Sequence, residues 1–184
     1  MKKEIIILGI DPGTIICGAG VISVFRNEEK LIHFEAIKNN PKELMHLRLK
    51  NIYDNLLKII TKFKPNEVAI ETAFYSKNAQ SALKIGQARG VALLAAAKFN
   101  LPITEYSPRE IKKSVVGSGS ASKEQMQFMT MSILKIKNKP KHFDESDALG
   151  IAICHSHRIL NSKNKFASWK KFLELHPERI KIIK

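Results

Sequence analysis

The sequence predicts a single mixed α/β domain in which helices flank a five-stranded sheet. Two observations support this fold class. Three apolar runs with short polar connections come first, which is typical of an antiparallel meander, and segments of helical and strand periodicity alternate after them. The chain has 184 residues, of which 44% are hydrophobic, so it suits one domain with one sizeable core.

The first three strands are predicted from short apolar runs. Residues 5–10 form a nearly continuous β-branched run, and the Asp-Pro-Gly turn at residues 11–13 ends it. Residues 17–25 and 31–37 are two further runs. The polar residues 26–30 between them predict a connecting loop.

Helices and strands alternate in the middle of the chain. After Pro41 the apolar residues recur at helical spacing as far as Phe63, which predicts a long helix. Residues 67–71 predict a fourth strand that ends in an acid. Residues 78–99 predict a second long helix, rich in Ala and Gly, and residues 102–106 a fifth strand.

The last part of the chain is predicted to be mainly helical. A short helix is followed by a Gly/Ser loop at residues 117–120. Residues 122–135 predict a helix, because Ser122 and Gln125 have the spacing of a capping box. Asp144 can cap a final helix that runs to about Ile159.

Charge is the most informative part of the composition. The chain has 31 Lys+Arg and 17 Asp+Glu, a net charge of +14. Such an excess favours a polyanionic partner, either nucleic acid or an anionic membrane surface, although a surface adapted for solubility gives the same number. No apolar run could span a membrane and no signal-peptide cleavage site follows the start, so we expect a cytoplasmic protein with reduced, buried cysteines. We expect residues 1–160 to form the domain and residues 161–184 a basic C-terminal extension.

Four carboxylates carry the chemical prediction. Asp11 and Glu71 each end a predicted strand, and acids at the ends of neighbouring strands lie close together in a layered fold. Asp144 and Asp147 are three positions apart on a predicted helix, so they share a face. If that face packs beside the strand ends, the acids repel each other by roughly 4 kcal/mol per pair at about 4 Å and an effective dielectric near 20. Such a cluster requires protonation or a bound cation.

Oxygen ligands without a Cys or His set select magnesium or manganese over zinc. Two such ions about 4 Å apart can activate a water and stabilise the leaving oxygen of a phosphodiester displacement. Each acid also has a simpler interpretation. Asp11 can be a turn former, Asp144 a helix cap, and Asp147 a solvated helix residue. Only their joint placement favours a metal-dependent nuclease.

Five segments of the chain occur together in an order that is typical of one family. They are residues 9–13 (GIDPG), 69–71 (AIE), 77–90 (KNAQSALKIGQARG), 115–119 (VVGSG) and 144–149 (DESDAL). These segments, which span roughly residues 4–158, resemble the RuvC-type Holliday-junction resolvases of bacteria. The resemblance implies an RNase H-like fold, a homodimer, and magnesium-dependent, paired nicking of the two symmetric strands of a four-way DNA junction.

The resemblance also implies roles for individual residues and partners. Asp11, Glu71, Asp144 and Asp147 match the family's catalytic acids, which are expected to bind Mg²⁺, two ions per subunit, with Mn²⁺ as a substitute. Phe74 matches an aromatic residue that stacks on a junction base. The basic residues expected to contact DNA are Lys112 and Lys123, which match the family, and Lys77 and Arg89, which lie around the site in the sequence. The branch-migration complex of RuvA and RuvB is implied as a partner.

Several features have more than one interpretation. Phe74 could instead fold back onto the core. His142 could serve as a base or an extra ligand, or be an exposed linker residue. Residues 154–157 (CHSH) hint at zinc, but two pairs of ligands at suitable spacing are missing. The small residues of the second long helix, including Gly86 and Gly90, can serve packing on the protein's own sheet or a dimer contact.

Two other functions compete with the nuclease. Residues 10–14 resemble the first phosphate loop of actin-like and sugar-kinase-like ATPases, although those proteins need two lobes and this chain has room for one. A noncatalytic junction-binding module would keep the fold, but all four acids are present here. The tail beyond Arg158 departs from the resemblance, since the family's chains usually stop sooner. Its charge favours an additional contact with DNA phosphates.

Overall fold

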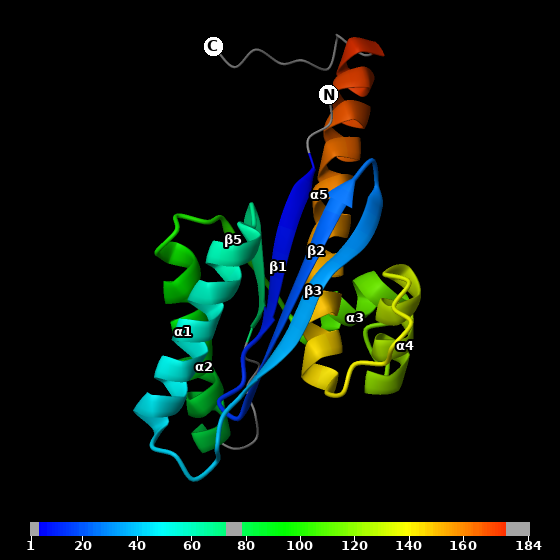
Figure 1. Ribbon diagram of the computed structural model, residues 1–184. Helices are drawn as coiled ribbons and strands as arrows, with labels where there is room; N and C mark the ends of the chain where they lie inside the picture. Colours follow the sequence, from blue (N-terminus) through cyan, green and yellow to red (C-terminus); the bar gives the residue numbers. More distant parts are fainter. Residues whose placement is uncertain (1–3, 73–78, 176–184) are drawn as a thin grey trace.

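The computed structural model describes residues 4–72 and 79–175, of which residues 162–175 are described by their backbone alone. A single mixed sheet forms the centre of the molecule, with helices on both faces (Figure 1). The strands and helices are β1 (Ile5–Asp11), β2 (Ile16–Phe25), β3 (Glu28–Lys38), α1 (Met45–Phe63), β4 (Glu67–Glu71), α2 (Ala79–Ala97), β5 (Ile103–Tyr106), α3 (Pro108–Val116), α4 (Lys123–Ile133) and α5 (Phe143–Leu175).

The strand order is β3-β2-β1-β4-β5. The first three strands pair antiparallel as a meander, whereas β4 pairs parallel with β1 and β5 pairs parallel with β4. The predicted five-stranded mixed sheet flanked by helices is therefore confirmed. Because β1 and β4 are parallel neighbours, their carboxyl ends lie at the same edge of the sheet.

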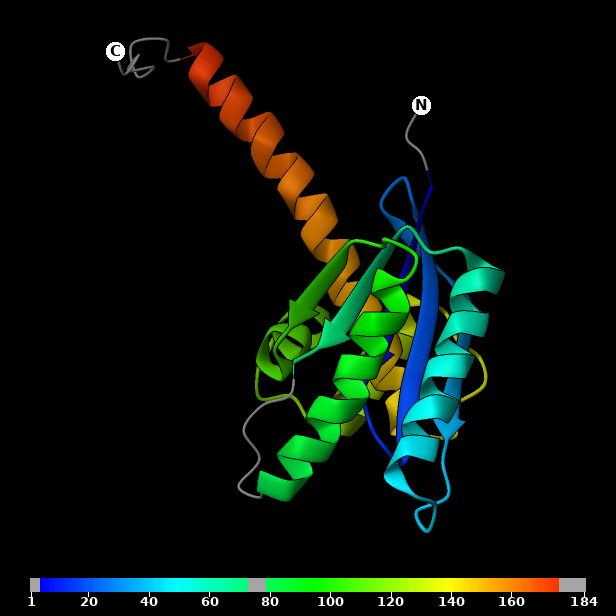
Figure 2. The ribbon, with the colours of Figure 1, turned by 90° about the vertical axis from the view of Figure 1, so that its left-hand side faces the viewer.

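Successive side chains of each strand point to opposite faces of the sheet, so the protein has two apolar cores, one on each face. On β1, Leu8 and Ile10 face α1 and α2, while Ile7 faces α3, α4 and α5. On β4, Val68 and Ile70 face the first pair of helices and Ala69 the second group. By the same period of two, Asp11 and Glu71 face the side that α5 covers. Figure 2 shows α1 and α2 together on the opposite face.

Two predicted boundaries are wrong for local reasons. The predicted loop over residues 26–30 shrinks to the two-residue turn Arg26-Asn27, and β3 already begins at Glu28. Both turn residues have positive φ, 50° and 69°, which matches the twist of a tight hairpin. The last helix continues past Ile159 to Leu175, because no Gly or Pro interrupts this stretch.

Helix α5 runs along the sheet and then projects beyond it (Figures 1 and 2). The helix is unbroken across residue 160, and the assignment of residues 161–184 to a separate extension stays a prediction. The capping box of α4 is confirmed, with the Ser122 hydroxyl accepting from the Gln125 backbone N–H. None of the helices in the described part of the chain is long and apolar enough to cross a bilayer.

Candidate active site

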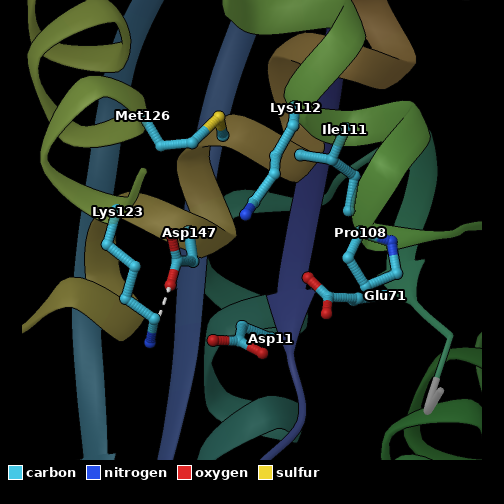
Figure 3. Close-up of a pocket in the computed structure, with 8 residues that line it drawn as sticks. All are labelled: Asp11, Glu71, Pro108, Ile111, Lys112, Lys123, Met126 and Asp147. Carbon is cyan, nitrogen blue, oxygen red and sulfur yellow. Dashed lines mark ion pairs between the residues drawn. The ribbon is translucent and has the colours of Figure 1, made fainter. Parts of the chain in front are cut away.

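Three of the four predicted acids line one cavity at the carboxyl ends of β1 and β4. Asp11 is the last residue of β1 and Glu71 the last of β4, so the pairing of these parallel strands places the two acids side by side. Asp147, in the second turn of α5, points into the same space (Figure 3). The cavity has a volume of about 260 Å³. Its other lining residues are Pro108, Ile111, Lys112, Lys123 and Met126.

Asp144 lies one turn before Asp147 and is not among the residues that line the cavity. Its charge nevertheless raises the pKa of both Asp11 and Asp147, so it belongs to the same electrostatic group. The prediction that Asp144 caps this helix is wrong. Helix α5 begins at Phe143, and the Glu145 carboxylate accepts the hydrogen bond from the His142 backbone N–H at 3.1 Å. Glu145 therefore has the capping role, which leaves the Asp144 carboxylate available for the site.

Glycines in β1 and β2 allow α5 to approach the sheet this closely. A Cβ added at Gly18 would lie 2.0 Å from the carbonyl oxygen of Asp144, and one at Gly9 would lie 2.1 Å from that of Ala148. Both distances are far below the 3.4 Å at which ordinary contact begins, so only glycine fits. Gly18 is also the partner of Asp11 in the β1–β2 ladder. Gly18, which allows α5 to come close to the sheet, therefore lies directly beside Asp11.

The sequence analysis assigned no role in helix packing to these glycines. The available signal is the alternation of Gly18 and Gly20 on β2, with Gly9 opposite Gly20 on β1. Glycine at alternate positions of a strand indicates that another backbone approaches that face. Which element approaches is not visible in the strands themselves.

Burial and mutual repulsion raise the pKa of three acids. The pKa of Asp11 is well above its ordinary value, chiefly because the carboxyl is buried and then because Glu71, Asp147 and Asp144 are near. Burial, followed by the charge of Asp147, raises the pKa of Glu71 to about 7. The pKa of Asp147 is raised mainly by burial, with a further contribution from Asp144.

Two lysines oppose this repulsion without cancelling it. Lys123 lowers the pKa of Asp11, Glu71 and Asp147, and Lys112 lowers that of Glu71 and Asp147, yet the net shift of each acid is upward. Lys123 Nζ lies 4.0 Å from Asp147 Oδ2. Burial is the largest cause of each shift, so the two amines reduce the upward shift of the pKa without reversing it.

This donor set fits a hard divalent cation. All the anionic ligands are carboxylate oxygens, and a cation would replace the protons that the raised pKa values hold in the site. Within residues 4–72 and 79–161, no three Asp, Glu, His or Cys side chains are already grouped tightly enough to hold an ion. Instead, the carboxylates surround the cavity, as Figure 3 shows. The site thus offers carboxylate oxygens as ligands, and these oxygens would have to move closer together to bind one cation.

The structure separates the residues predicted to contact DNA. Lys112, from α3, and Lys123, from α4, both line the cavity. Arg89 does not, because its guanidinium forms an ion pair with Glu105 between α2 and β5. Phe74 and Lys77 lie outside the described residues. A role in DNA binding stays a prediction for all five.

The other residues singled out in the sequence have structural partners. His155 and His157 each contact an acid and a hydroxyl, so the hint of zinc in residues 154–157 gains no support. Cys17 and Cys154 are buried and free, as predicted. Met126 is 3% exposed and fills the core as predicted, but it also forms part of the cavity wall.

Comparison with known proteins gives a consistent result along the sequence. A family model described as crossover junction endodeoxyribonuclease RuvC matches residues 7–155. The protein of that name from Desulforamulus reducens is 46% identical to this chain, over 82% of this chain and 93% of its own length. The one from Aeromonas salmonicida is 50% identical, over 83% of this chain and 87% of its own length. The protein of that name from Christiangramia forsetii is 38% identical over 98% of the chain and 95% of its own length, so this similarity includes the tail beyond Arg158.

Solved structures agree with the sequence comparison. The structure described as T. thermophilus RuvC in complex with Holliday junction substrate has a TM-score of 0.77 and 33% identity, and the match covers 83% of this chain and 93% of that one. The yeast mitochondrial Holliday junction resolvase has a TM-score of 0.65 at 17% identity, over 91% of this chain and 84% of that one, which is a likeness of fold alone. The predicted RNase H-like class is confirmed by these likenesses.

Proposed function

The chain belongs to the crossover junction endodeoxyribonuclease RuvC family, and we propose that Asp11, Glu71, Asp144 and Asp147 are the acids with which it cuts four-way DNA junctions. Members of this family hydrolyse phosphodiester bonds in DNA, so this chain is an endodeoxyribonuclease that acts on Holliday junctions in recombination and repair. Family membership excludes the ATPase alternative. The matched residues 7–155 include all four acids, which argues against a noncatalytic binding module.

One observation supports these residue assignments most directly. Carboxylates from β1, β4 and α5 line a single cavity, and burial together with neighbouring acids raises the pKa of Asp11 and Glu71. A buried cluster of like charges is costly for stability, and clusters of this kind occur where a protein binds a cation or carries out proton transfer. The apolar cavity walls from Ile111 and Met126 strengthen the electrostatic interactions inside.

The enzyme uses a divalent metal, as the family does. We propose magnesium, two ions per subunit, with manganese as a substitute, because hard cations prefer oxygen ligands. Asp11, Glu71 and Asp147 would hold the metal from the cavity wall, and Asp144 from the first turn of α5. When bound, the metal supplies an activated water and stabilises the leaving oxygen.

The two cavity lysines are suited to bind the scissile strand. Lys123 is 67% exposed and only 4.0 Å from Asp147, so its ammonium can pair with a phosphate at the mouth of the cavity. Lys112 approaches from α3 on another wall (Figure 3). Together they would orient a DNA phosphate above the acids while reducing the repulsion between phosphate and carboxylates.

A homodimer fits this substrate, since two active sites related by two-fold symmetry match two symmetric strands. The exposed face of α2 supports the proposal. Leu83 and Leu94 are 66% and 60% exposed, and a Cβ added at Gly86 or Gly90 would meet nothing within 4 Å. Small and apolar residues on one helix face allow close approach of a second copy. RuvA and RuvB as branch-migration partners, and a cytoplasmic location, are proposed on the family resemblance.

A labelled four-way junction tests the proposed function. Wild-type protein should introduce paired symmetric nicks with Mg²⁺ and none in EDTA, and a linear duplex of the same sequence should stay intact. Asp11→Asn and Glu71→Gln should bind the junction without nicking it. Asp54→Asn is the matched control, because Asp54 pairs with Lys50 on the exposed surface of α1. Wild-type protein that binds without nicking, or that nicks in EDTA, would show the proposal to be wrong.

A further inference from the structure

Helix α5 carries two histidines to which the proposed mechanism assigns no role. His155 is buried, with 3% of its side chain exposed, and His157 is half-buried. Each ring contacts partners through both of its nitrogens. A buried polar side chain is tolerated only when its hydrogen bonds are satisfied, and satisfied networks of this kind fix the relative position of the elements they join.

The first network joins α5 to β4 and β5. Tyr106 Oη lies 2.7 Å from His155 Nδ1, and His155 Nε2 lies 2.9 Å from Glu67 Oε2. Glu67 accepts, so the ring donates from Nε2–H and its Nδ1 accepts from the tyrosine hydroxyl. Burial lowers the pKa of His155, which agrees with this neutral ring.

The second network joins α5 to β3 and α3. His157 Nδ1 lies 3.0 Å from Ser114 Oγ, and His157 Nε2 lies 3.5 Å from Glu29 Oε1. The neighbouring Ser156 hydroxyl donates to the same Glu29 carboxylate. Because β3 and β5 are opposite edges of the sheet, the two networks attach α5 on both sides of the strands it crosses. The second network also attaches α3, which carries Lys112.

The distance from the first network to the acids is nearly the same along β4 and along α5. On β4, Glu67 and Glu71 are four residues apart and face the same side, a rise of about 13 Å. On α5, His155 and Asp147 are eight residues apart, a rise of about 12 Å. Holding His155 at Glu67 therefore holds Asp147 at the level of Glu71.

Near the acids, α5 contacts the glycines of the sheet through Ala148 and Ala152 against Gly9, the Asp144 backbone against Gly18, and Leu149 against Gly20. Leu149 is the large side chain among these contacts, and glycine and alanine offer little shape for neighbouring side chains to interlock with. The networks add directional hydrogen bonds to this packing. A slip of one residue would move the helix by about 1.5 Å and turn it by about 100°. That would take both aspartates of α5 away from the cavity.

On the basis of the proposed nuclease function, we propose that His155 and His157 are positioning residues. By bonding α5 to both edges of the sheet, they set the height of Asp144 and Asp147 relative to Asp11 and Glu71. They touch neither substrate nor metal. Their effect reaches the reaction through the placement of the helix acids.

The test compares His155→Gln, His157→Gln and Tyr106→Phe with a control on the same helix. Tyr106→Phe removes one oxygen, so it remains informative if a histidine variant does not fold. Ile153→Val is the control, because Ile153 is fully buried in α5 and the change lowers stability without touching the networks. For each protein we would measure thermal unfolding, junction affinity in EDTA, and the single-turnover nicking rate as a function of Mg²⁺ concentration.

The positioning role predicts a specific combination of results. The three variants should nick roughly tenfold to hundredfold more slowly and need more Mg²⁺ for half-maximal rate, because acids displaced by about 1 Å bind metal poorly. Their junction affinity in EDTA should equal that of the wild type, and Ile153→Val should nick at the wild-type rate. The proposal is overturned if His155→Gln and Tyr106→Phe keep the wild-type rate and Mg²⁺ dependence, or if Ile153→Val loses as much rate as they do. A wild-type protein that does not nick would instead overturn the proposed function.

Discussion

Replacing Gly18 by alanine should move the start of α5 away from the sheet. The new Cβ would lie 2.0 Å from the Asp144 carbonyl oxygen, whereas ordinary contact begins at 3.4 Å. The helix must therefore retreat by about 1.4 Å, the difference between these distances, because the obstructing atom is backbone and cannot rotate aside. This movement carries Asp144 and Asp147 away from Asp11. A misplacement of about 1 Å can cost roughly 100-fold in rate, and overpacking typically destabilises by about 1–3 kcal/mol.

The assay for Gly18→Ala is the nicking rate of a labelled junction at saturating protein, together with thermal unfolding. The expected destabilisation corresponds to a fall in Tm of about 2–12 °C for a chain of this size. Gly20→Ala should have a smaller effect, because its Cβ would meet the Leu149 nitrogen only at 2.8 Å and the flexible end of the Leu149 side chain at 2.9 Å.

Ile22→Val is the matched control for these glycine variants. It removes a buried methyl group from the same strand and should cost about 0.5–1.5 kcal/mol of stability without pushing α5. The nicking rate of this control should equal that of the wild type. A wild-type rate in Gly18→Ala, or an equal loss in Ile22→Val, would refute the reasoning.

Further predictions follow from charge and exposure. The pKa of Glu71 is raised to about 7 in the folded, metal-free protein, whereas its ordinary value in the unfolded chain is 4.5. Between these values the folded protein keeps a proton that the unfolded chain has lost. The free energy of unfolding in EDTA should therefore fall as pH rises from about 5 to 8. Thermal unfolding across that range measures this fall, and a Glu71→Gln variant with an unreduced slope would contradict it. Lys123→Met should weaken junction binding and reduce the dependence of log affinity on log salt by about one unit, as titrations at several salt concentrations can check; an unchanged slope would argue against phosphate contact. Leu94→Glu should yield monomers in sedimentation experiments, whereas a persisting dimer would rule out the α2 face. Deletion of residues after Leu160 should likewise reduce the salt dependence of junction binding, and an unchanged dependence would dismiss a DNA contact by the tail.

Strand ends were the part of the site that sequence could predict. Asp11 and Glu71 follow β-branched runs whose ends are unambiguous, and the parallel pairing of β1 and β4 places them together. Their raised pKa values agree with the predicted cluster of like charges. Local periodicity suffices for such features because each is set by a few neighbouring residues.

Features that depend on distant contacts were not predictable in the same way. The exchange of capping roles between Asp144 and Glu145 depends on where α5 begins relative to the sheet. The pairing of Arg89 with Glu105 joins α2 to β5, and neither segment specifies its partner. The close approach at Gly18 depends on the crossing of α5 over β2, which no single segment encodes.

The positions of the acids along the chain bear on how the protein is made. Asp11 comes from the first strand and Asp147 from the last helix, so the site unites the two ends of the domain. A nascent chain that the ribosome has extended only as far as β5 contains Asp11 and Glu71 but no α5, so it lacks two of the four acids of the proposed metal site. Because synthesis proceeds at about 5–20 residues per second from the N-terminus, the sheet can assemble before the helix emerges. Docking of α5 on the glycine face is then the step that completes the proposed site.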